Sequence, residues 1–447
     1  MKMRRKWRFI FVSAALFVII VSYKILEPEL FKNKDSIPSG DLSLKEPFER
    51  SDRVQDKDNQ ENDGEDQREI QLNEDHREAE DQKKEAPQHH VDVNEVVESM
   101  AKRFSLNFSY PLDTSPWRLA ASWVTPRQIH PENAKELGAI LKAMHEGKIT
   151  QADVGHRGTQ LKLTLVLDGK QKVVFKPAWY TRDYIVEGPP YAGRDRHNAE
   201  IAAFHLGRLN LLLSDEAPCF YGRCLYCKGP EDGVCAGSDG VLEGVLVLWM
   251  PEHFHLKLHR HPWGRTYRDG KLARWETDNT YCAQVQAVPT YSRGPRLLDI
   301  VDTAVLDFLV GNADRHHYET VEEGGRDAAL VILDNGKSFG NPDHDEMSIL
   351  APLYQCCQIR ASLWQRLLAL QEGVLSRVLA SVLGQDPIAP ILTDRHLSAL
   401  DRRLGAVLDQ IGACVDRVGI KAIVVDSSNG SSDHLKKDKR NSGVTVS

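Results

Sequence analysis

The chain has 447 residues, of which 41% are hydrophobic, and its formal net charge at pH 7 is -7 with an isoelectric point near 6.2. This size and composition predict one large domain, or two coupled domains, with a substantial core. The acidic balance gives no reason to expect nucleic acid as a partner.

The N-terminus predicts a membrane anchor. Residues 9–23 (FIFVSAALFVIIVSY) form an apolar run, and five basic residues precede it within residues 1–8. The run is slightly shorter than the roughly 20 residues of a usual span, but a thin early-secretory bilayer accepts it, and the basic flank favours a cytoplasmic N-terminus. A cleaved signal peptide is the alternative, although no small-residue cleavage site follows. We expect a cytoplasmic tail (1–8), a signal anchor (9–24) and a lumenal remainder.

Two segments predict disorder. Residues 25–93 form a stem dominated by charged and amide side chains, and such a segment cannot bury enough apolar surface to offset its ordering entropy. Residues 425–447, rich in Ser, Asn, Asp and Lys, are expected to be a disordered tail for the same reason. Asn107 and Asn429 begin N-glycosylation sequons that a lumenal location would expose.

All eight cysteines follow the predicted anchor. An even number of cysteines on the lumenal side predicts disulfide bonds, because that compartment is oxidising. In a cytosolic protein, the first four would instead suit a structural zinc knuckle. The cysteines are Cys219, Cys224, Cys227, Cys235, Cys282, Cys356, Cys357 and Cys414.

The folded part begins with two predicted helices, over residues 94–104 and 131–147. A hairpin follows, in which strands over residues 161–167 and 173–177 are joined by a turn at Asp168-Gly169. A glycine-bearing loop precedes the hairpin, and Lys176 lies near the end of its second strand. Kinases use such a loop and lysine to bind nucleotide phosphates, although glycine in a hairpin is more often only a turn residue.

A helix is then predicted from Asp195, with Asp195 or Asn198 as its cap. It carries Glu200, in the place where a kinase needs a carboxylate facing its lysine or its metal. A solvated glutamate would be the ordinary interpretation of such a residue. A linker strand over residues 243–250 follows.

Two aspartates then follow two apolar elements. Asp314 lies in a polar turn after a helical pattern over residues 297–309, and Asp334 directly follows a strand-like run over residues 329–333. Either aspartate alone would be an ordinary turn residue, and the His-Arg-Asp and Asp-Phe-Gly motifs of protein kinases are absent. The order of lysine, helix glutamate and two loop aspartates nevertheless predicts a bilobal kinase with Asp314 as general base.

Several longer motifs are more specific. They include DVGHRGTQLK, VVFKP, EGPPYAGRDRHNAEIAAFHL, HRHPWGRTYRDGKLARWE, GPRLLDIVDTAVLDFLVGNADRHHYE and LDNGKSFGNP. Through them the chain resembles, from about Pro116 to Val424, the secretory-pathway kinases of the family with sequence similarity 20. The resemblance implies an α+β, atypical bilobal protein-kinase-like fold stapled by disulfides. A helical segment (94–150) would precede a β-rich N-lobe (151–250) and a helical C-lobe (251–424).

The resemblance also implies a function. The enzyme would use ATP and Mn²⁺, with Mg²⁺ as the alternative ion, to phosphorylate the 2-hydroxyl of xylose in the xylose-galactose linkage glycan of proteoglycans. It would be a single-pass type II protein of the Golgi membrane, and it would form a homodimer or a heterodimer with related kinases.

Residue roles carried over from the family place Asp314 as catalytic base. Glu200 and Asp334 would bind the metal, and Gln160 and Lys176 would contact nucleotide phosphates. The other nucleotide-site residues would be Glu319 and the hinge residues Trp249, Met250, Pro251 and Glu252. The implied disulfides are Cys219–Cys235, Cys224–Cys227, Cys282–Cys356 and Cys357–Cys414.

One departure from the family lies at residues 207–218, where related chains carry a longer segment with strands of the N-lobe. The alternatives therefore include a Ser/Thr protein kinase of the same family, a pseudokinase that activates a relative, and a glycan-binding scaffold. The segment 253–275, rich in His, Arg and aromatic residues, suits either an acceptor groove or a structural connection between the lobes.

Overall fold

The computed structural model describes residues 92–131, 134–154, 159–208, 234, 243–268 and 270–425. The predicted anchor, almost all of the stem and tail, the glycine loop and most of the shortened segment lie outside these residues. In the part of the chain that is described, no helix combines the length and the apolarity needed to cross a bilayer.

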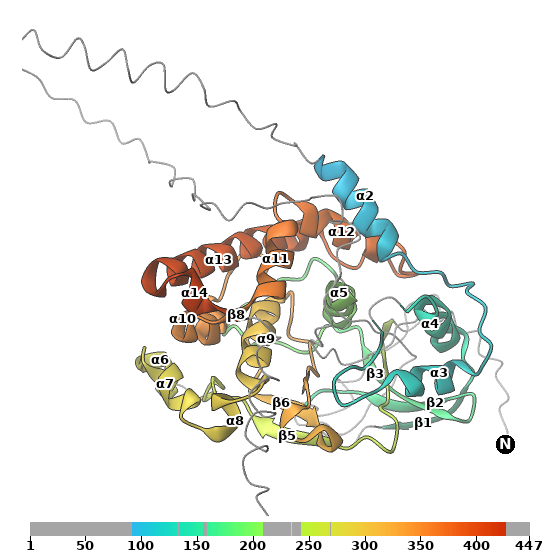
Figure 1. The fold of residues 1–447 in the computed structure, drawn as a ribbon. Coiled ribbons are helices and arrows are strands. Elements are labelled where there is room, and N and C mark those ends of the chain that lie inside the picture. The colour runs from blue at the N-terminus through green and yellow to red at the C-terminus, as the bar shows by residue number, and fades with distance from the viewer. Residues whose placement is uncertain are drawn as a thin grey trace, which may run out of the picture. The chain divides into compact units, whose positions relative to one another are not determined.

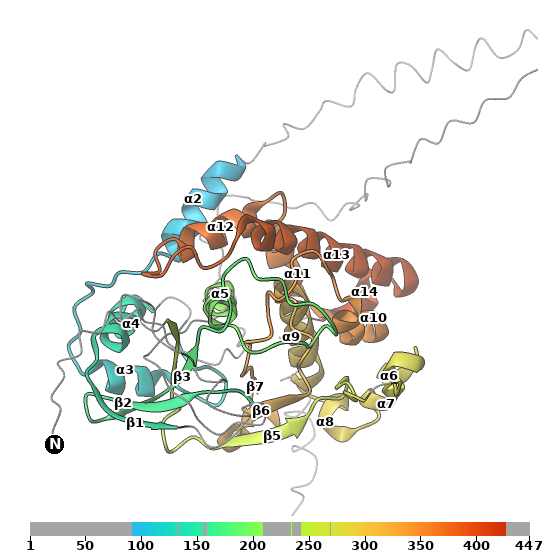
Figure 2. The same ribbon diagram turned by 180° about the vertical axis from the view of Figure 1, so that it is seen from behind.

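Three helices precede the N-lobe sheet: α2 (Val93–Arg103), α3 (Pro116–Trp123) and α4 (Leu137–Glu146). Helix α2 packs its apolar side on α12, as Figures 1 and 2 show, with Phe104 just after it in the same buried cluster. The helix predicted from residue 131 was placed too early, because Ala134 and Leu137 donate backbone hydrogen bonds three residues back and the chain continues in turns.

The N-lobe sheet is antiparallel, with its described strands in the order β1-β2-β3-β4. The strands are β1 (Ile149–Val154), β2 (Leu163–Leu167), β3 (Gln171–Pro177) and β4 (Gly244–Leu248). The predicted hairpin is confirmed as β2 and β3, and its turn residues Asp168 and Gly169 both have positive φ, as a two-residue turn of this kind requires. Strand β1 was not predicted, since it is largely polar and exposed and lacks an alternating pattern.

The two faces of this sheet have different roles. Strand pairing sets Leu163 and Leu246 opposite Phe175, so these apolar side chains share one face. They belong to a buried cluster that also contains side chains of α3 and α4, which cover this face. Because side chains alternate along a strand, Lys176 points to the opposite face.

The C-lobe is built around α9 (Arg296–Val310), which is buried along nearly its whole length. The helix ends at Gly311, whose φ of 72° is left-handed and where a Cβ atom would lie 2.9 Å from Arg403 Nη1. A small antiparallel sheet of β5 (Leu256–Arg260), β6 (His317–Val321) and β7 (Leu330–Val331) lies beside it. The strand predicted over residues 329–333 is therefore real but shorter.

Shorter elements complete this lobe. They are α6 (Arg274–Thr277), α7 (Tyr281–Gln286), α8 (Pro289–Ser292), α10 (Ala351–Cys356), α11 (Ala361–Ala369), α12 (Val374–Leu383), α13 (Asp394–Val418), α14 (Ile420–Ile423), the 3₁₀ helices η2 (Glu322–Asp327) and η3 (Met347–Leu350), and the parallel pair β8 (Ile359–Arg360) and β9 (Val424–Val425).

Two of the expected disulfides are confirmed, Cys282–Cys356 and Cys357–Cys414. They connect α10 and the residue after it to α7 and α13. The other four cysteines lie outside the described residues.

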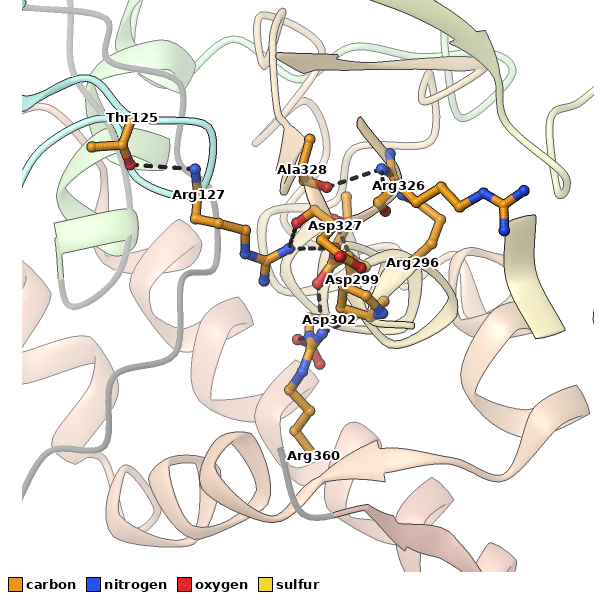
Figure 3. A network of polar contacts seen from close by, with 11 residues as sticks. Thr125, Arg127, Arg296, Asp299, Asp302, Arg326, Asp327, Ala328 and Arg360 are labelled. Atoms are coloured by element: carbon orange, nitrogen blue, oxygen red, sulfur yellow. Dashed lines mark hydrogen bonds and ion pairs between the residues drawn. The ribbon is translucent and has the colours of Figure 1, made fainter. Parts of the chain in front are cut away.

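A buried polar network joins the segment after α3 to the base of α9 (Figure 3). Arg127 Nη1 donates to the carbonyl oxygen of Asp327 at 2.6 Å and lies 3.8 Å from Asp299 Oδ2. Asp299 Oδ1 also accepts a hydrogen bond from Arg360 at 2.5 Å. The backbone N–H of Ala329 donates to Pro126 at 3.0 Å. The segment that precedes the N-lobe is thus fastened to the C-lobe.

Candidate active site

Three carboxylates surround the ammonium group of Lys176. Its Nζ atom donates to Glu200 Oε1 at 2.7 Å, to Asp334 Oδ1 at 2.5 Å and to Asp195 Oδ2 at 3.1 Å. Burial lowers the pKa of Lys176, but the three negative charges outweigh this effect and hold its pKa well above the ordinary value. Lys176 is therefore a fixed cation, and residues 158 positions apart in the chain meet at it.

Helix α5 (His197–Arg208) brings Glu200 to the lysine. Glu200 is fully buried, and its Oε1 atom also accepts the backbone N–H of Asn335 at 3.1 Å. One carboxylate thus holds both the strand lysine and the loop that carries Asp334. A solvated glutamate, the ordinary interpretation of this residue, is wrong.

Asp195 was expected only as a helix cap, but its carboxylate pairs with Lys176 instead. Burial raises the pKa of Asp195 to about 7, with the nearby Asp334 charge adding to the effect. The loop of Asp334 packs closely on this side chain, since a Cβ atom at Gly336 would lie 2.6 Å from the Asp195 Cβ and Cγ atoms. Gly336 is therefore required by a close approach.

Arg196 holds the same loop from its other side. Its backbone N–H donates to the carbonyl oxygen of Gly336 at 2.8 Å, and its guanidinium group donates to the carbonyl oxygens of Lys337 and Ser338. The start of α5 therefore positions the loop after β7, and with it the Asp334 carboxylate. This side chain remains 65% exposed, on the open side of the cluster.

Arg315 joins the two aspartate loops. Its guanidinium group forms two hydrogen bonds with the buried Asp307 carboxylate of α9, at 2.9 and 2.8 Å. It also donates to the carbonyl oxygen of Leu333 and to Asn335 Oδ1, which flank Asp334. Because Arg315 directly follows Asp314, the loop of the predicted base and the loop of the predicted metal ligand are held as one unit.

The carboxylate of Asp314 is partly exposed and lies beside two aromatic groups. Tyr267 donates its hydroxyl hydrogen to Asp314 Oδ1 at 2.5 Å. The His316 Nδ1 atom lies 2.8 Å from the Asp314 carbonyl oxygen, and hydrogen bonding to Asp314 raises the pKa of His316. The backbone N–H of Asp314 donates to Asn312 Oδ1 at 3.1 Å, which fixes the turn.

Gln160 and Glu319 lie on neighbouring elements. Gln160 is buried just before β2, and Glu319 is the central residue of β6, opposite Val331 of β7. Burial raises the pKa of Glu319, with the Arg315 charge opposing this effect. Their contacts with nucleotide stay predictions.

The hinge segment, Trp249 to Glu252, follows β4 as expected. It lines a cavity of about 200 Å³ together with Leu248, side chains of α3 and residues 170–172. Since Leu248 lies opposite Val173 in the sheet, this cavity is on the face away from Lys176. It is therefore distinct from a nucleotide site, and the predicted hinge contact with adenine is a matter for experiment.

The cluster fits a metal-bound nucleotide. Three buried polar atoms, Glu200 Oε2, Gln160 Nε2 and Asn335 Nδ2, have no hydrogen-bond partner among the described residues. A free carboxylate oxygen suits a hard cation, and free amide donors suit phosphate oxygens. Nowhere in the described ranges do three His, Cys, Asp or Glu side chains form a ready metal cluster. This agrees with a metal that one or two carboxylates hold together with substrate phosphates.

These elements define an α+β bilobal fold of the protein-kinase type. A family model described as "Golgi casein kinase, C-terminal, Fam20" matches residues 115–214 and 209–423. The chain therefore belongs to the Fam20 family.

Individual relatives agree with this assignment. The glycosaminoglycan xylosylkinase of Homo sapiens is 52% identical over 317 residues, which cover 64% of this chain and 77% of the relative. The structure of hydra Fam20 with sugar is 42% identical with a TM-score of 0.66, and the match covers 71% of this chain and 99% of that chain. The structure of the Golgi casein kinase with Mn/ADP bound is 26% identical with a TM-score of 0.65, covering 83% and 96%.

Two residues of the site were missed from the sequence. Asp195 was considered only as a cap, and Tyr267 lay in a segment for which two interpretations stayed open. The signal available for Asp195 was its place five residues before Glu200 in a motif otherwise rich in charged residues. For Tyr267 there was no local signal, because its partner Asp314 lies 47 residues further along the chain.

Proposed function

We propose that this protein is an ATP- and Mn²⁺-dependent kinase that phosphorylates the 2-hydroxyl of xylose in the linkage glycan of proteoglycans. The observation that carries the proposal is the meeting of Glu200 and Asp334 at Lys176, in a chain 52% identical to a glycosaminoglycan xylosylkinase. A member of the family with Mn/ADP bound and another with a sugar support the cofactors and the class of acceptor.

The nucleotide would bind at the carboxylate cluster. Glu200, through its free Oε2 atom, and Asp334, through its exposed carboxylate, would hold the metal. The metal, when bound, neutralises charge on the phosphates. Lys176 is already oriented by Glu200 and would then turn part of its hydrogen bonding to phosphate oxygens. The unpaired Gln160 amide would donate to the same phosphates.

Asp314 would act on the acceptor. The xylose 2-hydroxyl donates its proton to the Asp314 carboxylate as its oxygen bonds to the γ-phosphorus of ATP. The bond from that phosphorus to the leaving ADP oxygen breaks, so that the products are ADP and xylose 2-phosphate. Arg315 keeps Asp314 in register with the loop of Asp334 through its bonds to Leu333 and Asn335. Positioning of this kind is the main requirement of phosphoryl transfer.

The location proposed for this enzyme is the Golgi membrane, with the catalytic part lumenal. The apolar run at residues 9–23 after a basic flank supports a type II anchor. The two disulfides of the C-lobe support folding in an oxidising compartment. Pairing with a second copy or with a related kinase stays a prediction.

The test is phosphate transfer by the detergent-solubilised full chain from labelled ATP with Mn²⁺. The acceptors are a galactosyl-xyloside, the same glycoside with 2-deoxyxylose, and an acidic Ser peptide. Transfer to the first alone is expected, because only it offers a hydroxyl at the proposed position. Transfer to the peptide in place of the glycoside would instead identify a protein kinase. ATP use with none of these acceptors would reject xylose as the substrate.

A further inference from the structure

The hydroxyl of Tyr267 lies where a substrate hydroxyl would be expected. It donates to Oδ1 of Asp314 at 2.5 Å and lies 3.2 Å from Nδ1 of His316. A general base must come within about 2.6–3.2 Å of the oxygen whose proton it accepts. The phenol therefore makes, from within the protein, the contact that an acceptor hydroxyl must make with the base.

The backbone of Tyr267 is unusual for a bulky residue. Its φ is 53°, in the left-handed region that side chains other than glycine, asparagine and aspartate seldom adopt. The turn that follows is closed by pairing of Arg268 with Lys271, and Gly270 there also has a positive φ. Such backbone strain persists only where surrounding contacts stabilise it, and it is concentrated at functional sites. Here it places one hydroxyl on the catalytic carboxylate.

Aromatic contacts hold the ring over the base. Tyr191, in the loop between β3 and α5, meets the Tyr267 ring edge to face at 4.6 Å. The His316 ring meets it from the other loop at 5.3 Å, also edge to face. The side chain nevertheless keeps 38% of its surface exposed, so it has open space into which it can move. It is a contact between the lobes that is held by modest forces.

We propose that Tyr267 guards the catalytic base. Without an acceptor, its hydroxyl occupies the acceptor position on Asp314 and keeps water from being activated there. When the sugar binds, its hydroxyl replaces that of Tyr267, and the ring moves aside. This inference rests on the transfer to a glycan hydroxyl proposed above, but its main measurement needs no acceptor.

The reaction that the guard suppresses is hydrolysis of ATP. A water molecule on Asp314 would give its proton to the carboxylate while its oxygen bonds to the γ-phosphorus, and the bond to the ADP oxygen would break. The products are ADP and inorganic phosphate. Burial raises the pKa of Tyr267 well above its ordinary value, with the Asp314 charge adding to the effect, so the phenol remains a proton donor to Asp314.

The experiment compares Tyr267→Phe with the wild-type full chain. Phenylalanine keeps the ring contacts with Tyr191 and His316 and removes only the hydroxyl group. We expect ADP release without acceptor to rise about tenfold, while the KM for ATP stays unchanged and the KM for the acceptor falls or stays the same. The control is Tyr281→Phe, which removes a tyrosine hydrogen bond to the Pro262 carbonyl oxygen in the same region, away from Asp314.

Further measurements separate a guard from a residue that merely orients the base. In the double variant Tyr267→Phe/Asp314→Asn the extra hydrolysis should disappear, because it depends on the base. Thermal unfolding and Mn-ADP binding establish that each variant is folded. Unchanged or slower hydrolysis in Tyr267→Phe would overturn the proposal, and so would slower transfer at an unchanged rate of hydrolysis, which would indicate an orienting role. None of these outcomes depends on whether xylose proves to be the acceptor.

Discussion

Replacement of Asp314 by asparagine should separate chemistry from nucleotide binding. Asparagine keeps the side-chain size and an oxygen that accepts the Tyr267 hydrogen bond, but it cannot take a proton from an acceptor. General bases contribute roughly 10²–10⁴-fold to a rate, which is about 3–5 kcal/mol of transition-state stabilisation. The carboxylates bonded to Lys176 in the described structure are Asp195, Glu200 and Asp334. Asp314 is outside this set, so ATP affinity should change by about twofold or less.

The assay for Asp314→Asn has two parts, single-turnover phosphate transfer and a titration of Mn-ATP binding. Asp343→Asn is a matched control, because Asp343 is a surface carboxylate that pairs with Arg395 and is 55% exposed. We expect the control to resemble the wild type in both parts. If ATP affinity in Asp314→Asn fell as far as the transfer rate, or if transfer fell less than tenfold, Asp314 would not be the base.

Three other variants test separate parts of the structure. Asp334→Asn should abolish Mn²⁺-dependent nucleotide binding, and an unaltered Mn²⁺ titration would argue against its role as a ligand. Burial raises the pKa of Asp386 from 3.8 to about 7, so the folded protein keeps a proton that the unfolded chain loses. Stability due to this group is therefore lost as the pH rises from 4 to 7, on the order of 4 kcal/mol at most. Asp386→Asn keeps the oxygen that accepts the Ile388 N–H bond and should remove this dependence, which urea unfolding at pH 4 and pH 7.5 would measure. Finally, Cys282→Ser opens the link to Cys356 and should lower the free energy of unfolding by roughly 2–4 kcal/mol in non-reducing urea, whereas equal stability would contradict this estimate.

Local sequence patterns were sufficient for the elements that carry the chemistry. The buried face of α9 gave an unbroken helical pattern, and the turn at Asp168-Gly169 fixed the β2-β3 hairpin. The order of Lys176, Glu200 and the two loop aspartates then predicted the class of fold. Residue roles and the two described disulfides came from the family resemblance, because spacing along a chain does not determine which cysteines or side chains meet.

Features that depend on distant contacts could not be predicted. Strand β1 is polar and exposed, and it is a strand because β2 offers it a pairing edge. The start of α4 depends on the turns after Pro131, and the role of Asp195 depends on how the loop of Gly336 packs against it. Tyr267 meets Asp314 only because the segment after β5 folds back over the base.

The contact between Arg127 and the base of α9 bears on how substrates enter. Kinase lobes can separate about the linker that joins them, but here a second connection, at Pro126 and Arg127, ties the segment leading into the N-lobe to Asp299 and Ala329 of the C-lobe. A wide opening would have to break this connection as well as stretch the linker. The two lobes are thus held near their working distance before ATP arrives. Entry of nucleotide and sugar then depends on local movements of loops and side chains at the rim of the site.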